Sequence, residues 1–267
     1  MISTRLWVLH MIEQPIMVKI CDIREESPNV KTFFFERKIH FNPGQFVMVW
    51  IPLLDEKPFT ISYIQENLLG ISVLKKGPFT RVFHSKKAGD RIGIRGPYGK
   101  GFNLQINSCV VGGGIGMASL ATVIDTLPDV TIIQGARNSS EILYQKRFRN
   151  MRLCTEDGAV GFKGTTVDLL GEIIKKQHFR KVYACGPEPM LYKVVELCKK
   201  YDVDCEVSLD RYMKCGFGVC GQCDCSGQRV CVDGPVFTTS ELNKMEDFGK
   251  ITITKTGERV VIDKRII

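Results

Sequence analysis

The sequence lacks long apolar runs. In 267 residues, no stretch approaches the roughly 18 consecutive apolar residues of a membrane-spanning helix. The first ten residues include a short apolar stretch, but no small-residue cleavage site precedes Glu13, so we expect no secretory signal peptide. A composition of 44% hydrophobic and 25% charged residues excludes a disordered or fibrous chain. We therefore expect a globular protein that does not cross a membrane.

Dense charge and catalytic histidine patterns are also missing. Lys and Arg exceed Asp and Glu by 37 to 29, but they are spread along the chain, which argues against nucleic-acid binding and fits a surface for anionic cofactors. No Ser-His-Asp or His-based metal pattern accompanies the histidines, so the sequence predicts no catalytic side chain that acts on a substrate. The four isolated histidines are His10, His40, His84 and His178.

Cysteine, by contrast, is unevenly distributed. Six of the 11 cysteines are scattered, and five lie between residues 215 and 231. In a chain without a secretion signal, such a group indicates a metal site rather than a disulfide framework. Four of them follow the pattern C-x4-C-x2-C-x7-C, in which the first three have the plant-type spacing of a [2Fe–2S] cluster. These four are Cys215, Cys220, Cys223 and Cys231.

Two alternatives remain for this group. Zinc would more typically be bound by two C-x2-C pairs, of which only one is present, and redox-active thiols are the other possibility. Spacing alone does not decide whether Cys225 or Cys231 is the fourth ligand.

The hydrophobic pattern divides the chain into an all-β part and an α/β part. Between residues 17 and 103, short Val-, Ile- and Phe-rich segments separated by Gly and Pro turns predict a barrel or sandwich. Beyond residue 108, strands alternate with helices, which predicts a parallel sheet. The second set of strands is expected at 108–111, 130–133, 151–154 and 181–184, with helices up to 127 and at 141–149, 166–177 and 187–201.

Two strand-to-helix turns in the α/β part are rich in glycine. Glycines there let the backbone approach a pyrophosphate, and the following helix supplies free N–H groups. The strict G-x-G-x-x-G pattern fits no register, and the alternatives are close helix–strand packing for the glycines and a buried apolar role for the cysteine. The residues of the two turns are Gly112, Gly113, Gly114, Gly116, Cys185, Gly186 and Pro187.

Together, these motifs resemble the ferredoxin–NADP reductase superfamily. Within it, the chain is most similar to the electron-transfer subunits of type B dihydroorotate dehydrogenase, over roughly residues 15–240. That family places its fourth cluster ligand just before an Asp-Gly-Pro sequence, which favours Cys231. The matching stretches are 57–62, 96–102, 112–116, 155–158, 184–190 and 208–237.

The resemblance implies three parts. An antiparallel β-barrel that binds FAD is expected at 12–104, a parallel α/β domain that binds NAD at 105–207, and a small [2Fe–2S] segment at 208–267. Near the end of the last part, residues 251–254 and 259–262 are expected to pair as a hairpin.

The resemblance also implies individual cofactor-binding residues. The superfamily has Arg where Lys57 stands, and lysine offers a point charge without the bidentate fork. Thr60 and Ser62 would direct hydroxyls toward the flavin, whereas without the family this segment would be an ordinary edge strand. Pro78 and Phe79 depart from the family's phosphate turn. The expected residues are Lys57, Pro58, Phe59, Thr60, Ile61, Ser62, Gly77 and Thr80 for FAD, with Asp157 in the matching stretch of the NAD domain.

The implied function is electron transfer in the cytoplasm. A nicotinamide exchanges two electrons and a [2Fe–2S] cluster one, so a flavin, which can do both, must lie between them. The family's partner is an FMN-containing subunit that oxidises dihydroorotate in pyrimidine biosynthesis, in a heterotetramer of two copies of each chain. Tyr212, Phe217 and Val219, near the cysteines, would belong either to the partner surface or to the core.

Two other functions share many of these motifs. One is a flavin and iron–sulfur subunit of a hydrogenase, a sulfide dehydrogenase or a ferredoxin:NAD(P) reductase. The other is a zinc-stabilised nucleotide-binding regulator. Arg137, Ser139 and Ser140 could receive the 2′-phosphate of NADP, although the family likeness favours NAD.

Overall fold

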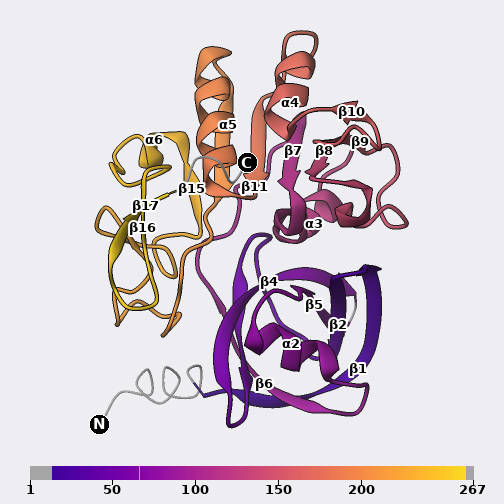
Figure 1. The fold of residues 1–267 in the computed structure, drawn as a ribbon, viewed down its shortest axis with the longest axis vertical. Helices are drawn as coiled ribbons and strands as arrows, with labels where there is room; N and C mark the ends of the chain where they lie inside the picture. Colours follow the sequence, from indigo (N-terminus) through magenta and orange to yellow (C-terminus); the bar gives the residue numbers. More distant parts are fainter. Residues whose placement is uncertain (1–13, 66, 263–267) are drawn as a thin grey trace.

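The computed structural model describes residues 14–65 and 67–262. The expectations for the first ten residues, including His10, therefore lie outside the described residues, as do residues 12 and 13 of the barrel range and the last five of the C-terminal range. A barrel and an α/β layer stack along the long axis, and the C-terminal segment runs beside both (Figure 1). No helix in the described part is long and apolar enough to cross a bilayer.

The first layer is a closed antiparallel barrel, as predicted. Its strand order is β1-β2-β5-β4-β3-β6, and closure leaves no unpaired strand edge. Buried aromatic and aliphatic side chains, among them Phe33, Phe35 and Ile71, fill the interior. The strands are β1 (Ile16–Ser27), β2 (Val30–Glu36), β3 (Phe46–Ile51), β4 (Asp55–Gln65), β5 (Leu68–Leu74) and β6 (Arg91–Tyr98).

The expectation that residues 17–103 are entirely β is wrong at one segment. Helix α2 (Pro78–Ser85) begins with Pro at its first turn, where the missing N–H costs nothing. Phe79 and Phe83 form its buried face. Phe83 stacks on Phe33 with ring centroids 4.4 Å apart, and Phe79 on Phe59 at 6.0 Å. The helix thus packs onto the aromatic core of the barrel.

The second layer is a seven-stranded sheet of order β10-β9-β8-β7-β11-β12-β15. Every pairing is parallel except that of β15 with β12, so the predicted parallel α/β domain is confirmed. The pattern analysis did not indicate β12. The strands are β7 (Ser108–Gly113), β8 (Thr131–Ala136), β9 (Arg152–Thr155), β10 (Phe162–Lys163), β11 (Lys181–Cys185), β12 (Asp204–Ser208) and β15 (Val236–Thr238).

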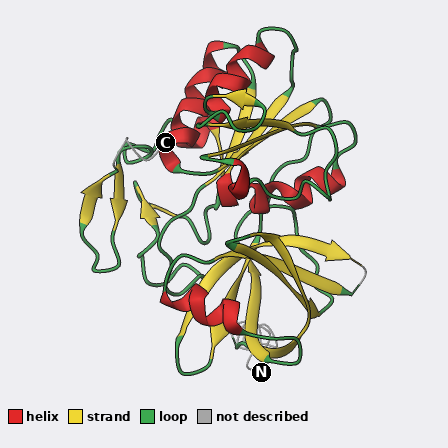
Figure 2. Ribbon diagram, turned by 45° about the vertical axis from the view of Figure 1, so that its right-hand side comes forward, coloured by secondary structure: helices red, strands yellow, loops and turns green. Residues whose placement is uncertain are grey.

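Helices lie on both faces of this sheet (Figure 2), and buried apolar residues form a core on each face. Helices α4 (Thr166–Ile174) and α5 (Glu188–Lys200) pack on one face. On the other face, α3 (Met117–Thr126) follows the 3-10 turn η1 (Gly114–Gly116).

The helix expected at 141–149 is absent. A 3-10 turn, η2 (Ser139–Glu141), is followed by irregular chain that buries Leu143, Tyr144 and Phe148. Tyr144 has a φ of +59°, a left-handed conformation that a right-handed helix cannot contain.

The cysteine segment is an excursion from the sheet. The chain leaves β12 at Ser208 and returns in β15 at Val236, directly opposite. Between them, β13 (Asp224–Cys225) and β14 (Gln228–Arg229) form a short hairpin. After α6 (Thr239–Leu242), strands β16 (Ile251–Ile253) and β17 (Arg259–Val261) form the predicted terminal hairpin. The cysteine loop is therefore held at both ends by the sheet.

Candidate cofactor sites

The four spaced cysteines come together as two pairs. The Cys231 N–H lies 3.4 Å from the Cys223 sulfur, and the thiols of these two residues are also hydrogen-bonded. Cys215 is hydrogen-bonded to the exposed Cys220. Within the described residues, no three His, Cys, Asp or Glu side chains converge into a closed metal-ligand set. The structure thus pairs the predicted ligands two by two without bringing all four to one point.

The chemistry of this loop fits a thiolate-bound metal centre. Burial opposes ionisation of Cys215, but backbone N–H groups of Cys220 and Phe217 lower its pKa to about 6. A hydrogen bond from Cys231 lowers the pKa of Cys223 to about 7. The thiolate is the form that binds metals. Glycines with positive φ shape the loop; they are Gly216, Gly218 and Gly221.

Cys225 has a different environment. It is fully buried, and its sulfur lies 3.4 Å from Nη2 of the buried Arg211. Burial raises the pKa of Cys225 to about 11. Its thiol therefore stays protonated near neutral pH, unlike those of Cys215 and Cys223.

Residues 57–62, which are expected to bind FAD, belong to β4 and lie where the barrel meets the α/β domain and the cysteine segment. The Lys57 ammonium pairs with Asp55 and lies 5.3 Å from the centre of the Tyr212 ring. Across the domain boundary, the Thr60 hydroxyl is 2.9 Å from the Ser119 hydroxyl. The sequence analysis did not indicate this contact, because the two residues lie 59 positions apart.

Two other residues of this segment are already partnered within the protein. The Ser62 hydroxyl is fully buried and lies 2.8 Å from that of Ser72, which also accepts a hydrogen bond from the Tyr144 hydroxyl of the nucleotide domain. Phe59 packs against the aromatic face of α2, with its ring centroid 6.0 Å from that of Phe79. Thr60 thus contacts the nucleotide domain directly, through Ser119, and Ser62 is linked to it through Ser72 and Tyr144.

Gly77 and Thr80 lie at the N-terminus of α2. The Thr80 hydroxyl accepts hydrogen bonds from the N–H groups of Lys76 and Gly77, each at 2.9 Å. A Cβ atom added at Gly77 would meet no other atom within 4 Å. This turn therefore has open space beside a helix N-terminus, which suits a phosphate group.

The two glycine-rich turns of the sheet touch each other. A Cβ atom at Gly116 would overlap the carbonyl group of Cys185, and one at Gly113 would come within 3.1 Å of Pro187 Cδ. Gly116 is thus needed for close packing. Gly114, with a φ of +52°, has open space where its side chain would be. Both turns lie at the carboxyl edge of the sheet, where open α/β sheets bind ligands.

The helices that begin at these turns have no side-chain caps. Neither α3 nor α5 has a side-chain hydrogen bond at its N-cap, whereas Thr165 caps α4. No side chain therefore occupies either helix N-terminus, which leaves both open to an anionic ligand, although the Met117 N–H already donates to the carbonyl oxygens of Gly114 and Ile115.

Cys185 lies between the two domains as a neutral thiol. Burial raises its pKa to about 11, and it is hydrogen-bonded to Ser119 and Ser208. Cys185 is thus buried and protonated, as expected of an apolar core residue. Its hydrogen bond to Ser119 also links it, through Ser119, to Thr60.

Polar groups follow the ends of β8 and β9 at the same edge. The exposed Asp157 accepts a hydrogen bond from the Ala159 N–H at 2.9 Å, which lowers the pKa of the Asp157 carboxyl group. Arg137 donates to both carboxylate oxygens of Glu141, at 3.2 and 2.6 Å. The guanidinium that could have bound a 2′-phosphate is therefore already paired with a carboxylate.

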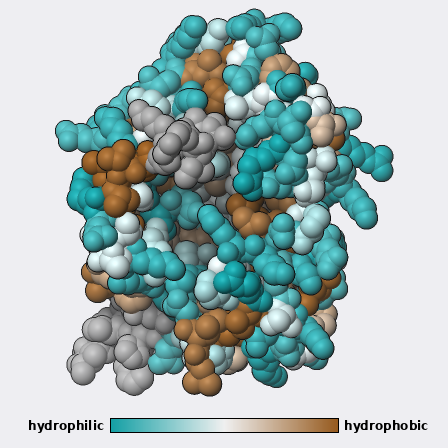
Figure 3. All heavy atoms as spheres, in the orientation of Figure 1, coloured by the Kyte–Doolittle hydropathy of each residue, from teal (hydrophilic) through white to brown (hydrophobic). Residues whose placement is uncertain are grey.

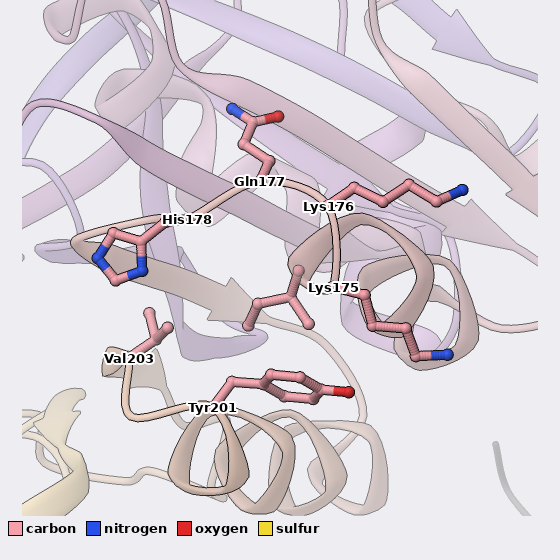
Figure 4. A pocket seen from close by; sticks show the side chains of 7 residues that line it. Lys175, Lys176, Gln177, His178, Tyr201 and Val203 are labelled. Atoms are coloured by element: carbon pink, nitrogen blue, oxygen red, sulfur yellow. The ribbon is translucent and has the colours of Figure 1, made fainter.

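The opposite edge of the sheet carries a separate hollow of about 340 Å³ between the ends of α4 and α5. His178, Lys175 and Tyr201 are among its lining residues (Figure 4). None of the predicted cofactor-binding residues lines this hollow, so we do not assign it to the nucleotide site.

Comparison with known proteins agrees with this architecture. Residues 210–243 match the family described as the iron–sulfur cluster binding domain of dihydroorotate dehydrogenase B. A protein of Methanocaldococcus jannaschii is 42% identical over 259 residues, covering 93% of this chain and 99% of the relative. A protein of Methanothermobacter thermautotrophicus is 41% identical, covering 92% and 97%. Both carry the name "Probable dihydroorotate dehydrogenase B (NAD(+)), electron transfer subunit".

A solved structure shares the fold over most of the chain. It is the electron-bifurcating NADH-dependent reduced ferredoxin–NADP oxidoreductase, with 27% identity and a TM-score of 0.76 over 85% of this chain and 89% of that one. Barrel, nucleotide-binding sheet and cysteine segment define an iron–sulfur oxidoreductase of the flavin-reductase class. More narrowly, the chain belongs to the family of electron transfer subunits of dihydroorotate dehydrogenase B.

Proposed function

We propose that this chain passes electrons from an FMN-containing subunit that oxidises dihydroorotate to NAD⁺, as part of pyrimidine biosynthesis. When bound, the cluster supplies one-electron transfer, and FAD supplies both one-electron and hydride transfer. The cysteine loop carries this proposal, because its four spaced cysteines come together in two hydrogen-bonded pairs within the segment that matches the iron–sulfur cluster binding family. Membership of the family supports the same conclusion.

Within the loop, we assign all four spaced cysteines as cluster ligands. Their pairing by hydrogen bonds supports this set. Cys225 is left out because its sulfur is hydrogen-bonded to Arg211 and belongs to neither pair. The ligands are then Cys215, Cys220, Cys223 and Cys231.

For FAD, we assign the exposed side of β4 and the N-terminus of α2. Lys57 would supply a positive charge for the phosphates, and Gly77 the open turn beside them. The Thr60 hydroxyl, which now contacts Ser119, is the group on β4 best placed to orient a ring bound between the two domains. Phe59, which packs against Phe79 of α2, and Ser62, which is bonded to Ser72, would hold the strand in place from its two faces.

For the nicotinamide nucleotide, we assign the turns at Gly112–Gly116 and Cys185–Pro187, together with Asp157. The uncapped N-termini of α3 and α5 would receive the pyrophosphate. The contact of Arg137 with Glu141 favours NAD over NADP, because the carboxylate would repel a 2′-phosphate.

The partner would dock over the exposed side of the cysteine loop. Val219 there is 77% exposed and Val232 39%, close to the exposed Cys220. On the face seen in Figure 3, apolar side chains form separate patches among polar ones. We propose an assembly of two copies of each chain, working in the cytoplasm, where free thiols such as these eleven stay reduced.

Purification with the native partner under oxygen-free conditions tests this function. We expect an FMN-bearing chain to copurify, with FAD, iron and sulfide bound and dihydroorotate-dependent reduction of NAD⁺. A nickel or multi-cluster partner would contradict the proposal and favour the hydrogenase type of reductase. Zinc without flavin would contradict it in favour of the regulator.

A further inference from the structure

A buried arginine of the barrel is hydrogen-bonded to the cysteine loop. Arg95 lies on β6 and is 5% exposed. Its Nη2 donates a hydrogen bond of 2.6 Å to the carbonyl oxygen of Cys215. Its guanidinium also lies 5.2 Å from the centre of the Phe217 ring. Arg95 of the flavin-binding domain thus contacts the backbone of Cys215, the first of the four cysteines assigned to the cluster.

Glu56 holds this arginine in place. Arg95 donates from Nε and Nη2 to the two carboxylate oxygens of Glu56, at 2.7 and 2.5 Å, and from Nη1 to the Tyr98 hydroxyl at 3.2 Å. Burial alone would lower the pKa of Arg95, but the hydrogen bonds to Glu56 and Tyr98 raise it. The bidentate contact fixes the orientation of the guanidinium plane.

Gly216, which follows Cys215, also packs closely against the barrel. A Cβ atom at Gly216 would lie 2.8 Å from Cγ of Met48, which is a buried residue of β3. Residues 215–217 therefore all rest on the barrel. Cys223 and Cys231, by contrast, belong to the core shared with the sheet. The Arg95 contact is thus where the barrel and the first ligand meet.

Charge at this point bears on the cluster. Reduction adds one electron and makes the cluster more negative, so a nearby buried cation favours the reduced form and a nearby anion disfavours it. Hydrogen bonding and burial around the ligands act on the potential in the same way. Here the cation, Arg95, and the anion, Glu56, are in direct contact, so their effects on the reduction potential oppose each other.

We propose that Arg95, oriented by Glu56, is a positioning residue for the cluster, which seats Cys215 on the barrel and sets the reduction potential. This inference rests on the proposed function, since it requires the loop to hold a [2Fe–2S] cluster. The two side chains have opposite effects: Arg95 raises the potential and Glu56 lowers it.

Redox titration of the purified complex, followed by the electron paramagnetic resonance of the reduced cluster, tests the proposal. In Arg95→Gln, we expect the one-electron equilibrium to move toward the oxidised form by roughly tenfold, which is about 59 mV downward. In Glu56→Gln, we expect a shift upward. Arg95→Lys should change the reduction potential less than Arg95→Gln does, because it keeps the positive charge. It should still broaden the resonance, because lysine cannot make the bidentate contact of the guanidinium.

A matched control uses another ion pair between barrel and C-terminal segment. Lys100 and Glu241 are 3.5 Å apart and solvent-exposed, so Lys100→Gln should leave the potential unchanged. A merely structural role would move the potential of Arg95→Gln and Glu56→Gln in the same direction, and either that result or no shift in both would overturn the proposal. If Arg95→Gln loses the cluster, the direction of the Glu56→Gln shift decides. Wild-type protein without iron would instead contradict the proposed function.

Discussion

The cysteines of the loop at 215–231 and those of the parallel sheet differ in what surrounds their sulfur atoms. In the loop, hydrogen bonds lower the pKa values of Cys215 and Cys223 to about 6 and 7. In the sheet, burial raises those of Cys154 and Cys185 to about 12 and 11. Hydrogen bonds thus favour the thiolate forms of Cys215 and Cys223, the forms that bind metals, while the hydrogen bond to Cys223 raises the pKa of Cys231. Burial keeps the thiols of the sheet neutral.

The largest effect should come from removing one loop thiol. Cys220→Ser is expected to abolish the cluster, because three thiolates cannot complete the set of four. FAD should remain bound, since its expected residues lie on the barrel. Iron analysis and the visible spectrum of oxygen-free protein measure both. The matched variant Cys198→Ser, in the core of the sheet, should keep its iron, and full NAD⁺-linked turnover by Cys220→Ser would show the ligand assignment to be wrong.

Alkylation of cluster-free protein measures the contrast directly. At pH 7, iodoacetamide should modify Cys215 well before Cys154 and Cys185, because Cys215 is partly exposed and the thiolate is the reactive form. With a pKa of about 6, the thiolate fraction of Cys215 falls as the pH drops, so its labelling should slow roughly tenfold between pH 7 and pH 5. Peptide mass spectrometry locates the modified residues. Equal labelling of both groups would remove the distinction between them.

A substitution at the contact between the two turns should affect the sheet and spare the cluster. Gly116→Ala places a methyl group against the Cys185 carbonyl, and overpacking of this kind costs about 1–3 kcal/mol. We expect lower stability in urea and weaker NADH binding, with an unchanged cluster spectrum. Gly171→Ala in α4, whose new Cβ would have its nearest neighbour at 3.9 Å, should instead stabilise the protein by roughly 0.5–1 kcal/mol. Loss of iron in Gly116→Ala would show that the two regions are coupled.

The smallest effect should come from a helix cap. The Thr165 hydroxyl accepts a hydrogen bond from the Asp168 N–H at 3.3 Å, and Thr165→Ala should cost about 1 kcal/mol of unfolding free energy. Thr165→Ser keeps the hydroxyl and should cost less. Urea titrations compare the two variants, and iron content should be that of the wild type in both. A cost above that of Gly116→Ala would contradict this ranking.

The parts of the fold that depend on local pattern could be predicted from the sequence. The barrel strands, the parallel sheet and the terminal hairpin follow alternation and turn chemistry. Helix α2 was missed because Gly77-Pro78 is typical of a turn, although Phe79 and Phe83 have the four-residue spacing of one helix face. The segment after Glu141 has helix-forming residues, but the Tyr144 hydroxyl bonds to Ser72 across the domains at 2.6 Å, and this tertiary contact overrides propensity.

The candidate site divides in the same way. Ligand spacing is a local property, and the four cysteines and the glycine turns are visible in the sequence. Arg95 and Cys215 are separated by 120 positions, so no local pattern could connect them. The contact of Thr60 with Ser119 likewise requires the barrel and the sheet to be in place first.

Because Ser208 pairs directly with Val236, the polypeptide departs from the sheet and rejoins it at neighbouring positions. The entropic cost of closing such a path grows only slowly with its length. Chain connectivity therefore sets little limit on the length of the segment between these two residues. Packing sets the limit instead, because Cys223 and Cys231 belong to the core of the sheet and Arg95 bonds to Cys215. A replacement module would leave the nucleotide-binding scaffold folded only if it restored these contacts.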